Sequence, residues 1–145
     1  MFSITSRLKF NRIFKPVNET HCRYRVVLGS AGSGKSVNVA QDFILKLSDT
    51  KYTGANLLVI RKSEGTNRYS TFAELQAVIF RMCGEYWEDF WIINSSRLMI
   101  TSKITGNSII FRGVNDKKQR EKLKSITFPK GKLMWVWIEE ATELE

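Results

Sequence analysis

Eight consecutive residues carry the strongest chemical signal in this chain of 145 residues. The pattern G-x-x-x-x-G-K-[ST] binds phosphate, because its glycines let the backbone bend around an anion and the following helix points its first N–H groups at the anion's oxygens. In this pattern the lysine contacts the β- and γ-phosphates and the hydroxyl residue binds Mg²⁺. We therefore expect a nucleotide-binding loop with Lys35 on phosphate and Ser36 on the metal. The residues that fit are Gly29, Ser30, Ala31, Gly32, Ser33, Gly34, Lys35 and Ser36.

Two adjacent carboxylates, Glu139 and Glu140, follow six apolar residues at positions 133–138. A buried strand that ends in acidic residues is typical of the element that faces a phosphate-binding loop across Mg²⁺. In that arrangement Glu139 holds the metal opposite Ser36, and Glu140 polarises the attacking water. An alternative stays open: residues 141–144 could begin a helix, whose N-terminal dipole the two carboxylates would stabilise.

The phosphate-binding motif has this meaning only between a strand and a helix. Residues 24–28, Tyr-Arg-Val-Val-Leu, predict a buried strand, and residues 36–47 predict a helix with an apolar stripe. A continuous apolar run at residues 57–60 predicts a strand covered on both faces of a parallel sheet. This run ends in Arg61, at the edge where open α/β sheets bind their ligands.

Further along the chain, residues 70–84 predict a helix with Ser70 as its N-cap, and residues 91–94 predict a strand. Two apolar runs at residues 98–101 and 108–112 flank a turn and predict an antiparallel pair. Together these elements predict an α/β fold of the P-loop NTPase class. It has a mainly parallel central sheet flanked by helices, with a small antiparallel excursion.

Positive charge is concentrated in two blocks of the chain, whose formal net charge is +9. Residues 1–35 hold seven basic residues and one acidic residue, and residues 103–132 hold nine basic and two acidic. The second block includes a short, strongly basic helix expected at residues 116–124. Such an excess favours a polyanionic partner, of which nucleic acid is the commonest, over a basic surface that only aids solubility.

Several classes of protein are excluded by composition. Cys22 and Cys83 are the only cysteines and lack metal-ligand spacing, so neither a disulfide framework nor a zinc site is expected. His21 is the only histidine, and nothing near it supports a Ser-His-Asp or Cys-His mechanism. No apolar run approaches the length of a membrane span, and the N-terminus lacks the apolar core of a signal peptide.

The two ends of the chain differ from the middle. Residues 1–22 form a basic and aromatic leader before a P-loop domain at residues 23–145, and the spacing of Phe10, Ile13 and Phe14 predicts a short helix that ends before Pro16. This leader could pack near the adenine of a bound nucleotide, serve as a docking arm, or be a frayed end of the chain. Since only five residues follow Glu140, we expect a fragment whose sheet is incomplete at the C-terminus.

The ordered set of these segments resembles the N-terminal ATPase region of phage terminase large subunits of the PBSX type. The resemblance rests on residues 24–36, 57–62, 70–75 and 109–113, and above all on the Val-Trp-Ile-Glu-Glu-Ala run at residues 136–141. It covers roughly residues 23–145. The phosphate-binding loop alone is shared by many NTPases, whereas the whole set is far more specific.

This resemblance implies a Mg²⁺-dependent ATPase that helps to drive double-stranded viral DNA into a prohead in the host cytoplasm. It also implies a small terminase subunit and a portal as partners, and a ring of identical subunits at full length. The family's nuclease domain would lie wholly beyond Glu145. Family members often carry an arginine where this chain has Ala31, so Arg61, Arg68, Arg112 or a neighbouring subunit would have to supply that cation.

Two other functions remain open on the sequence. Another P-loop enzyme, such as a helicase-like ATPase or a nucleotide kinase, would share the loop, but a kinase also needs an acceptor site and an arginine-rich lid, and no such segment is evident. A truncated remnant would bind nucleotide or DNA without turnover.

Overall fold

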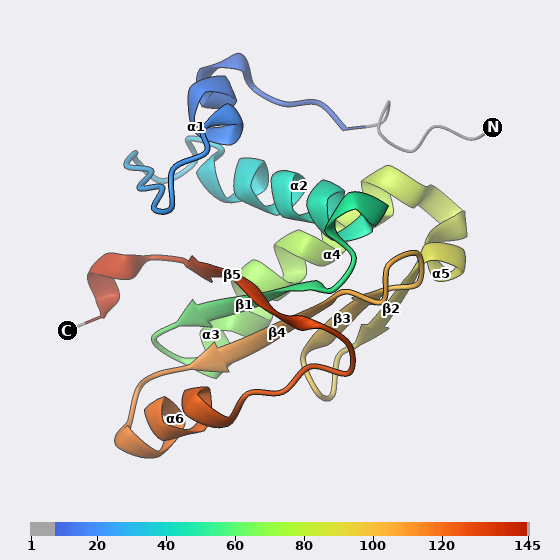
Figure 1. Ribbon diagram of the computed structural model, residues 1–145. Coiled ribbons are helices and arrows are strands. Elements are labelled where there is room, and N and C mark those ends of the chain that lie inside the picture. The colour runs from blue at the N-terminus through green and yellow to red at the C-terminus, as the bar shows by residue number, and fades with distance from the viewer. Residues whose placement is uncertain (1–7, 145) are drawn as a thin grey trace.

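Five strands form one mixed sheet in the order β2-β3-β4-β1-β5 in the computed structural model, which describes residues 8–144 (Figure 1). β1 pairs in parallel with β4 and β5, whereas β3 pairs antiparallel with β2 and β4. The predicted antiparallel excursion is confirmed, but parallel and antiparallel pairings are equal in number, so the sheet is mixed and not mainly parallel. The strands are β1 (Ala55–Arg61), β2 (Trp91–Asn94), β3 (Met99–Ser102), β4 (Ser108–Gly113) and β5 (Lys132–Ile138).

Helices cover both faces of this sheet (Figure 1). α2 (Lys35–Ser48) and α4 (Ala73–Cys83) pack on one face, and α6 (Lys117–Lys122) lies on the other. The predicted helices at residues 36–47 and 116–124 are confirmed. Among residues 8–144, no helix combines the length and the apolar character needed to cross a bilayer. The shorter helices are α1 (Lys15–Glu19), α3 (Glu64–Asn67) and α5 (Trp87–Phe90).

β1 lies at the centre of the core and is buried on both faces, as its apolar run predicted. Because side chains alternate along a strand, Leu57 and Val59 join the large cluster with α2 and α4, while Leu58 and Ile60 face the opposite side. There they join Ile110 of β4 in a smaller cluster, which is covered by residues before and after α6, among them Leu123 and Phe128. Two separate apolar layers therefore hold the sheet between its helices.

The predicted strand at residues 24–28 is wrong, because this segment is extended chain outside the sheet. Tyr24, Val26 and Leu28 are 78%, 81% and 86% exposed. A strand exists only where a neighbour pairs with its N–H and C=O groups, and the described sheet ends at β5. The outer edge of β5 is also uncovered, so that Met134 is 61% and Val136 49% exposed, where full burial was expected.

Two helix boundaries also differ from those expected. The segment before α4 is already helical from Glu64, where the Ser63 side chain accepts a hydrogen bond from the N–H of Thr66, so Ser63 and not Ser70 is the cap. In the leader, α1 runs through Pro16, because proline is tolerated in the first turn of a helix. Residues 1–7 of the predicted leader lie outside the described residues.

The described part of the leader packs on α2. Phe14 is buried, and the amides of Asn18 and Asn38 exchange two hydrogen bonds of 2.8 Å. The side chain of Gln41 donates to the carbonyl of Lys9 at 3.0 Å. Of the alternatives left open for the leader, a frayed end is therefore excluded for residues 9–18.

Candidate functional site

A glycine-rich loop precedes α2, as the motif predicted. Gly32 and Gly34 have φ angles of +76° and +84°, a left-handed conformation that glycine adopts without strain. Gly34 is also the N-cap of α2, and an α-helix leaves its first N–H groups without partners inside the helix. These groups and the positive end of the helix dipole favour an anion at this point.

The side chain of Lys35 folds back over this loop. Its Nζ atom donates to the carbonyl of Gly29 at 2.6 Å, to the carbonyl of Ser30 at 2.9 Å and to the Ser33 hydroxyl at 3.1 Å. The ammonium group thus lies against the residues that the motif assigns to phosphate binding. Residues 29–34 are exposed, so this charge faces an accessible loop.

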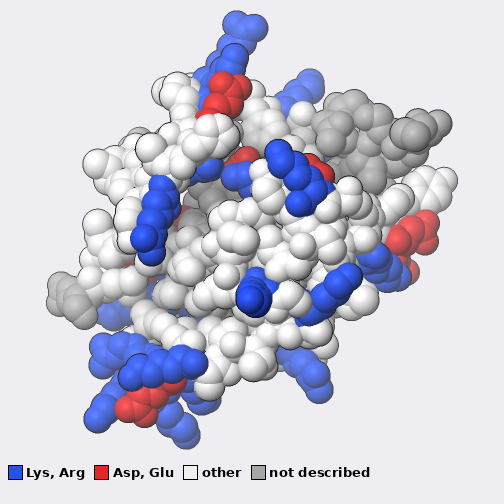
Figure 2. All heavy atoms as spheres, viewed as in Figure 1, with Lys and Arg blue, Asp and Glu red and all other residues white. Residues whose placement is uncertain are grey.

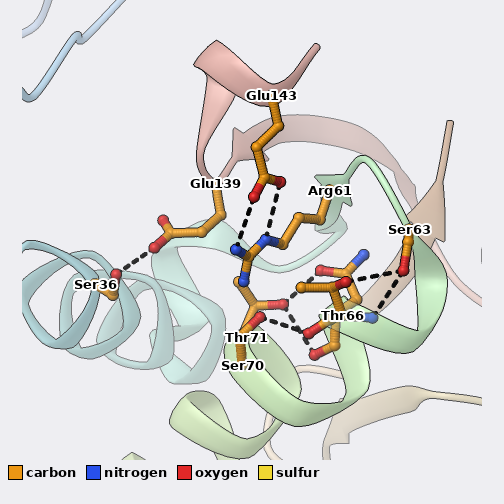
Figure 3. Close-up of polar contacts among 9 residues, drawn as sticks. Ser36, Arg61, Ser63, Thr66, Ser70, Thr71, Glu139 and Glu143 are labelled. Atoms are coloured by element: carbon orange, nitrogen blue, oxygen red, sulfur yellow. Dashed lines mark hydrogen bonds and ion pairs between the residues drawn. The ribbon is translucent and has the colours of Figure 1, made fainter. Parts of the chain in front are cut away.

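Ser36 and Glu139 meet although they are 103 positions apart in the sequence (Figure 3). The Ser36 hydroxyl donates a short hydrogen bond to Oε1 of Glu139, and the indole N–H of Trp137 donates to Oε2 at 3.0 Å. The N–H of Glu139 also donates to the carbonyl of Ile60 at 3.1 Å, which fixes the residue at the end of the β1–β5 ladder. The sequence predicted the Ser36–Glu139 pair but not the contribution of Trp137.

Glu140 lies beside this pair in the sequence but has an unusual backbone. Its φ of +52° is rare for a residue with a side chain, and such outliers cluster at functional sites. A single 3₁₀ turn, Ala141–Glu143, follows it, yet the Glu140 side chain makes no capping hydrogen bond to that turn. A helical turn thus begins where the alternative placed one, with Glu140 at its N-cap position, but as a single 3₁₀ turn without a hydrogen bond from the Glu140 side chain.

One of the three arginines considered for the missing loop cation lies near the site. Arg61 forms a two-pronged ion pair with Glu143, with distances of 3.2 Å from Nη2 to Oε1 and 3.4 Å from Nε to Oε2 (Figure 3). Arg68 donates to the carbonyl of Ser95 at 2.7 Å. Arg112 lies on the face of the sheet away from Ser36. It shares that face with Ile110, two positions earlier in β4, which belongs to the smaller apolar cluster.

Ser36 and Glu139 border an open cavity of about 300 Å³. Its other wall is the π-helical turn Arg68–Phe72, which sequence reasoning missed because such a turn has no local signature. Buried Asn67 holds this turn by donating to the carbonyl of Arg112 at 2.9 Å and accepting from the Thr71 hydroxyl at 2.5 Å. Tyr69, Ser70, Thr71, Ala73 and Glu74 complete the lining.

The donor set at this point fits one kind of metal. Mg²⁺ prefers oxygen ligands and is usually held by one or two carboxylates together with water and substrate phosphates. The Ser36 hydroxyl and the Glu139 carboxylate supply such oxygens side by side. Among residues 8–144, no group of three or more His, Cys, Asp or Glu side chains could hold a metal by itself.

Comparisons with known proteins point to one family. The sequence profile of the phage terminase large subunit matches residues 21–145. The chain is 36% identical over 126 residues to "Terminase, large subunit" of Bacillus phage SPP1, covering 86% of this chain and 27% of that protein. It is 33% identical over 127 residues to "PBSX phage terminase large subunit" of Bacillus subtilis (strain 168), covering 84% and 25%. The chain thus spans about a quarter of the length of these relatives.

Proposed function

Because this chain belongs to the phage terminase large subunit family, we propose that residues 29–36 bind ATP with Mg²⁺. In this proposal the chain is the ATP-binding and ATP-hydrolysing part of a motor that moves double-stranded viral DNA. Both relatives are named as terminase large subunits, which supports a terminase role for this chain. The proposed activity of these residues is ATP hydrolysis and not DNA cleavage.

The observation that carries the proposal is the contact between the Ser36 hydroxyl and Glu139. A P-loop NTPase needs its loop hydroxyl and the acidic strand end to face the same metal. Those two groups come from distant parts of the sequence, yet the β1–β5 pairing and the start of α2 bring them together. If the glycine-rich turn matched the motif only by chance, its hydroxyl residue would not be expected to contact an acidic residue at a strand end.

Each side chain has a separate task in this proposal. Lys35 exchanges its loop contacts for β- and γ-phosphate oxygens, with the first N–H groups of α2 as further donors. Ser36 and Glu139 supply oxygen ligands for Mg²⁺, with Trp137 holding the free oxygen of Glu139. Bound Mg²⁺ would neutralise charge on the phosphates. Glu140 orients and polarises the attacking water.

The partners follow from the family and are proposals for this chain as well. They are double-stranded DNA, a small terminase subunit and a portal, with several copies of the large subunit in a ring. The basic excess of residues 103–132 supports a polyanionic partner. The location would be the host cytoplasm during virion assembly.

Binding and turnover of ATP test this function together. Glu140→Gln should bind a fluorescent ATP analogue as tightly as the parent chain but lose at least about a hundredfold in turnover, because only the water-activating carboxylate is removed. Glu88→Gln, at an exposed position of α5, is the matched control and should leave both quantities unchanged. Binding without turnover in the parent would reject the ATPase, and no Mg²⁺-dependent binding would reject the site.

A further inference from the structure

We infer that the outer surface of α6 binds the phosphate backbone of double-stranded DNA. This α6 surface consists of Lys117, Lys118, Arg120, Lys122 and Lys124. The inference rests on the proposed function for its choice of double-stranded DNA as the partner, and on the structure for the position of the binding surface. It gives DNA a contact on the face of the sheet opposite the nucleotide site.

The five basic side chains of the α6 surface are all exposed, and only one acidic residue, Glu121, stands among them. Figure 2 shows Lys and Arg side chains gathered at the lower left of the molecule, where Figure 1 places α6. The helix begins at Asp116, whose carboxylate caps it by accepting from the N–H of Gln119 at 2.7 Å. That carboxylate therefore has a structural task at the helix start.

No carboxylate of the described residues forms an ion pair with the α6 surface. Among residues 8–144, Lys15, Lys46 and Arg81 each form an ion pair with an acidic residue of their own helix. None of the five side chains on the α6 surface takes part in an ion pair of the described residues. Their charge is thus available for an external polyanion.

The α6 surface is also held firmly in place. Leu123, directly after α6, packs with Ile126 and Phe128 against Leu58 and Ile110 of the sheet. This apolar contact anchors the end of α6 to the sheet, while within α6 only Gln119 is not exposed. A rigid array loses less conformational entropy on binding than a frayed tail does.

Two further arginines extend the charge along the same face of the sheet. Arg97 and Arg112 line an open cavity of about 370 Å³ together with Phe128, which packs against the smaller apolar cluster. Arg97 is exposed, and Arg112 uses one Nη atom to donate to the carbonyl of Phe111 at 2.8 Å. The cavity therefore offers guanidinium groups on the face of the sheet where Leu123 and Phe128, which follow α6, are packed.

The dimensions suit a DNA backbone. A helix of six residues is roughly 9 Å long, and over that length one strand of a duplex presents about three phosphates. Neutralising about three phosphates lowers the slope of log affinity against log salt by about 0.9 for each contact. Since each lysine or arginine that contacts a phosphate contributes about one unit to that slope, the α6 surface should account for about two to three units of it.

The test measures binding of the 145-residue chain to a labelled 30-base-pair duplex by fluorescence anisotropy, from about 50 to 200 mM salt. The variant Lys117→Gln/Lys118→Gln/Lys122→Gln should weaken binding at least about tenfold at 100 mM salt and make the slope of log affinity against log salt less negative by about two to three. The matched control Lys9→Gln/Lys51→Gln/Lys62→Gln loses the same charge from exposed positions elsewhere, none of which forms an ion pair with a described residue. It should change affinity less than about threefold.

Equal weakening in both variants, or no DNA binding by the parent chain, would overturn the inference. Tighter binding to a duplex RNA of the same sequence would also overturn it, because the partner would then be another nucleic acid. The rise in unfolding midpoint with Mg²⁺-ATP reports nucleotide binding, so it distinguishes a failure of DNA binding at α6 from a failure of the proposed ATP site. The α6 variant should keep that shift, whereas Lys35→Ala should lose it and still bind DNA.

Discussion

The indole nitrogen of Trp137 donates a hydrogen bond of 3.0 Å to Oε2 of Glu139, while the other oxygen of Glu139 accepts from Ser36. Both oxygens of the predicted metal ligand are therefore oriented by neighbours. Trp137 is only 6% exposed and stacks on Phe43, with ring centroids 6.3 Å apart. The carboxylate is thus held from within the core.

Trp137→Phe should weaken Mg²⁺-dependent ATP binding by roughly tenfold, because outer partners of a metal ligand commonly contribute that much to affinity. Phenylalanine keeps the ring contact with Phe43 and removes only the N–H donor. Trp135→Phe is the matched control, since Trp135 contacts the rings of Phe43 and Tyr52 and not the carboxylate. Titration calorimetry with Mg²⁺-ATP measures both, and equal affinities would show that Trp137 does not orient Glu139.

Arg61→Gln should weaken ATP binding by about tenfold, because charge-assisted contacts to phosphate are among the strongest in proteins. The guanidinium of Arg61 lies at the end of β1 beside Glu139, and its side chain is only 15% exposed. Arg68→Gln, which removes the donor to Ser95, should leave ATP binding unchanged. Glu143→Gln removes the ion pair but leaves Arg61 free to contact phosphate, so it separates a role in ATP binding from a role in holding the turn after β5. If Arg61 serves only to hold the turn after β5, Glu143→Gln will match the effect of Arg61→Gln.

Gly131→Ala should destabilise the fold by about 2 to 4 kcal/mol, through strain at positive φ and overlap with backbone. Gly131 has a φ of +79°, and a Cβ there would lie 2.2 Å from the carbonyl oxygen of Gly54. That carbonyl accepts from the N–H of Lys132 at 2.9 Å, so the first residue of β5 is joined here to the residue just before β1. Urea unfolding measures the change. Gly65→Ala is the control, because a Cβ there has no neighbour closer than 3.8 Å, and an equal loss in both would refute the close-approach argument.

The elements that sequence patterns predicted well are those with local causes. The apolar run of β1 is buried on both faces, and the capped basic helix α6 is present. Glu139 also lies where a strand end facing Ser36 required it. In each case the residues of one segment determine its structure, or a motif links two segments by a known chemistry.

The features that sequence patterns missed depend on contacts between distant segments. Residues 24–28 have the composition of a strand, but the sheet described here gives them no partner, so they are exposed. The π-helical turn and the ion pair between Arg61 and Glu143 likewise arise from tertiary packing. No local pattern distinguishes Glu143 from the other acidic residues at the end of the chain.

Binding of ATP by residues 29–36 is tested most simply by the thermal unfolding midpoint with and without Mg²⁺-ATP. A ligand that binds only the folded chain stabilises it by about 2.7 kcal/mol at a hundred times its Kd, so the midpoint must rise. We expect a rise in the parent chain and in Lys62→Ala, which changes an exposed lysine directly after β1, and none in Lys35→Ala. An equal rise in Lys35→Ala, or no rise in the parent, would contradict it.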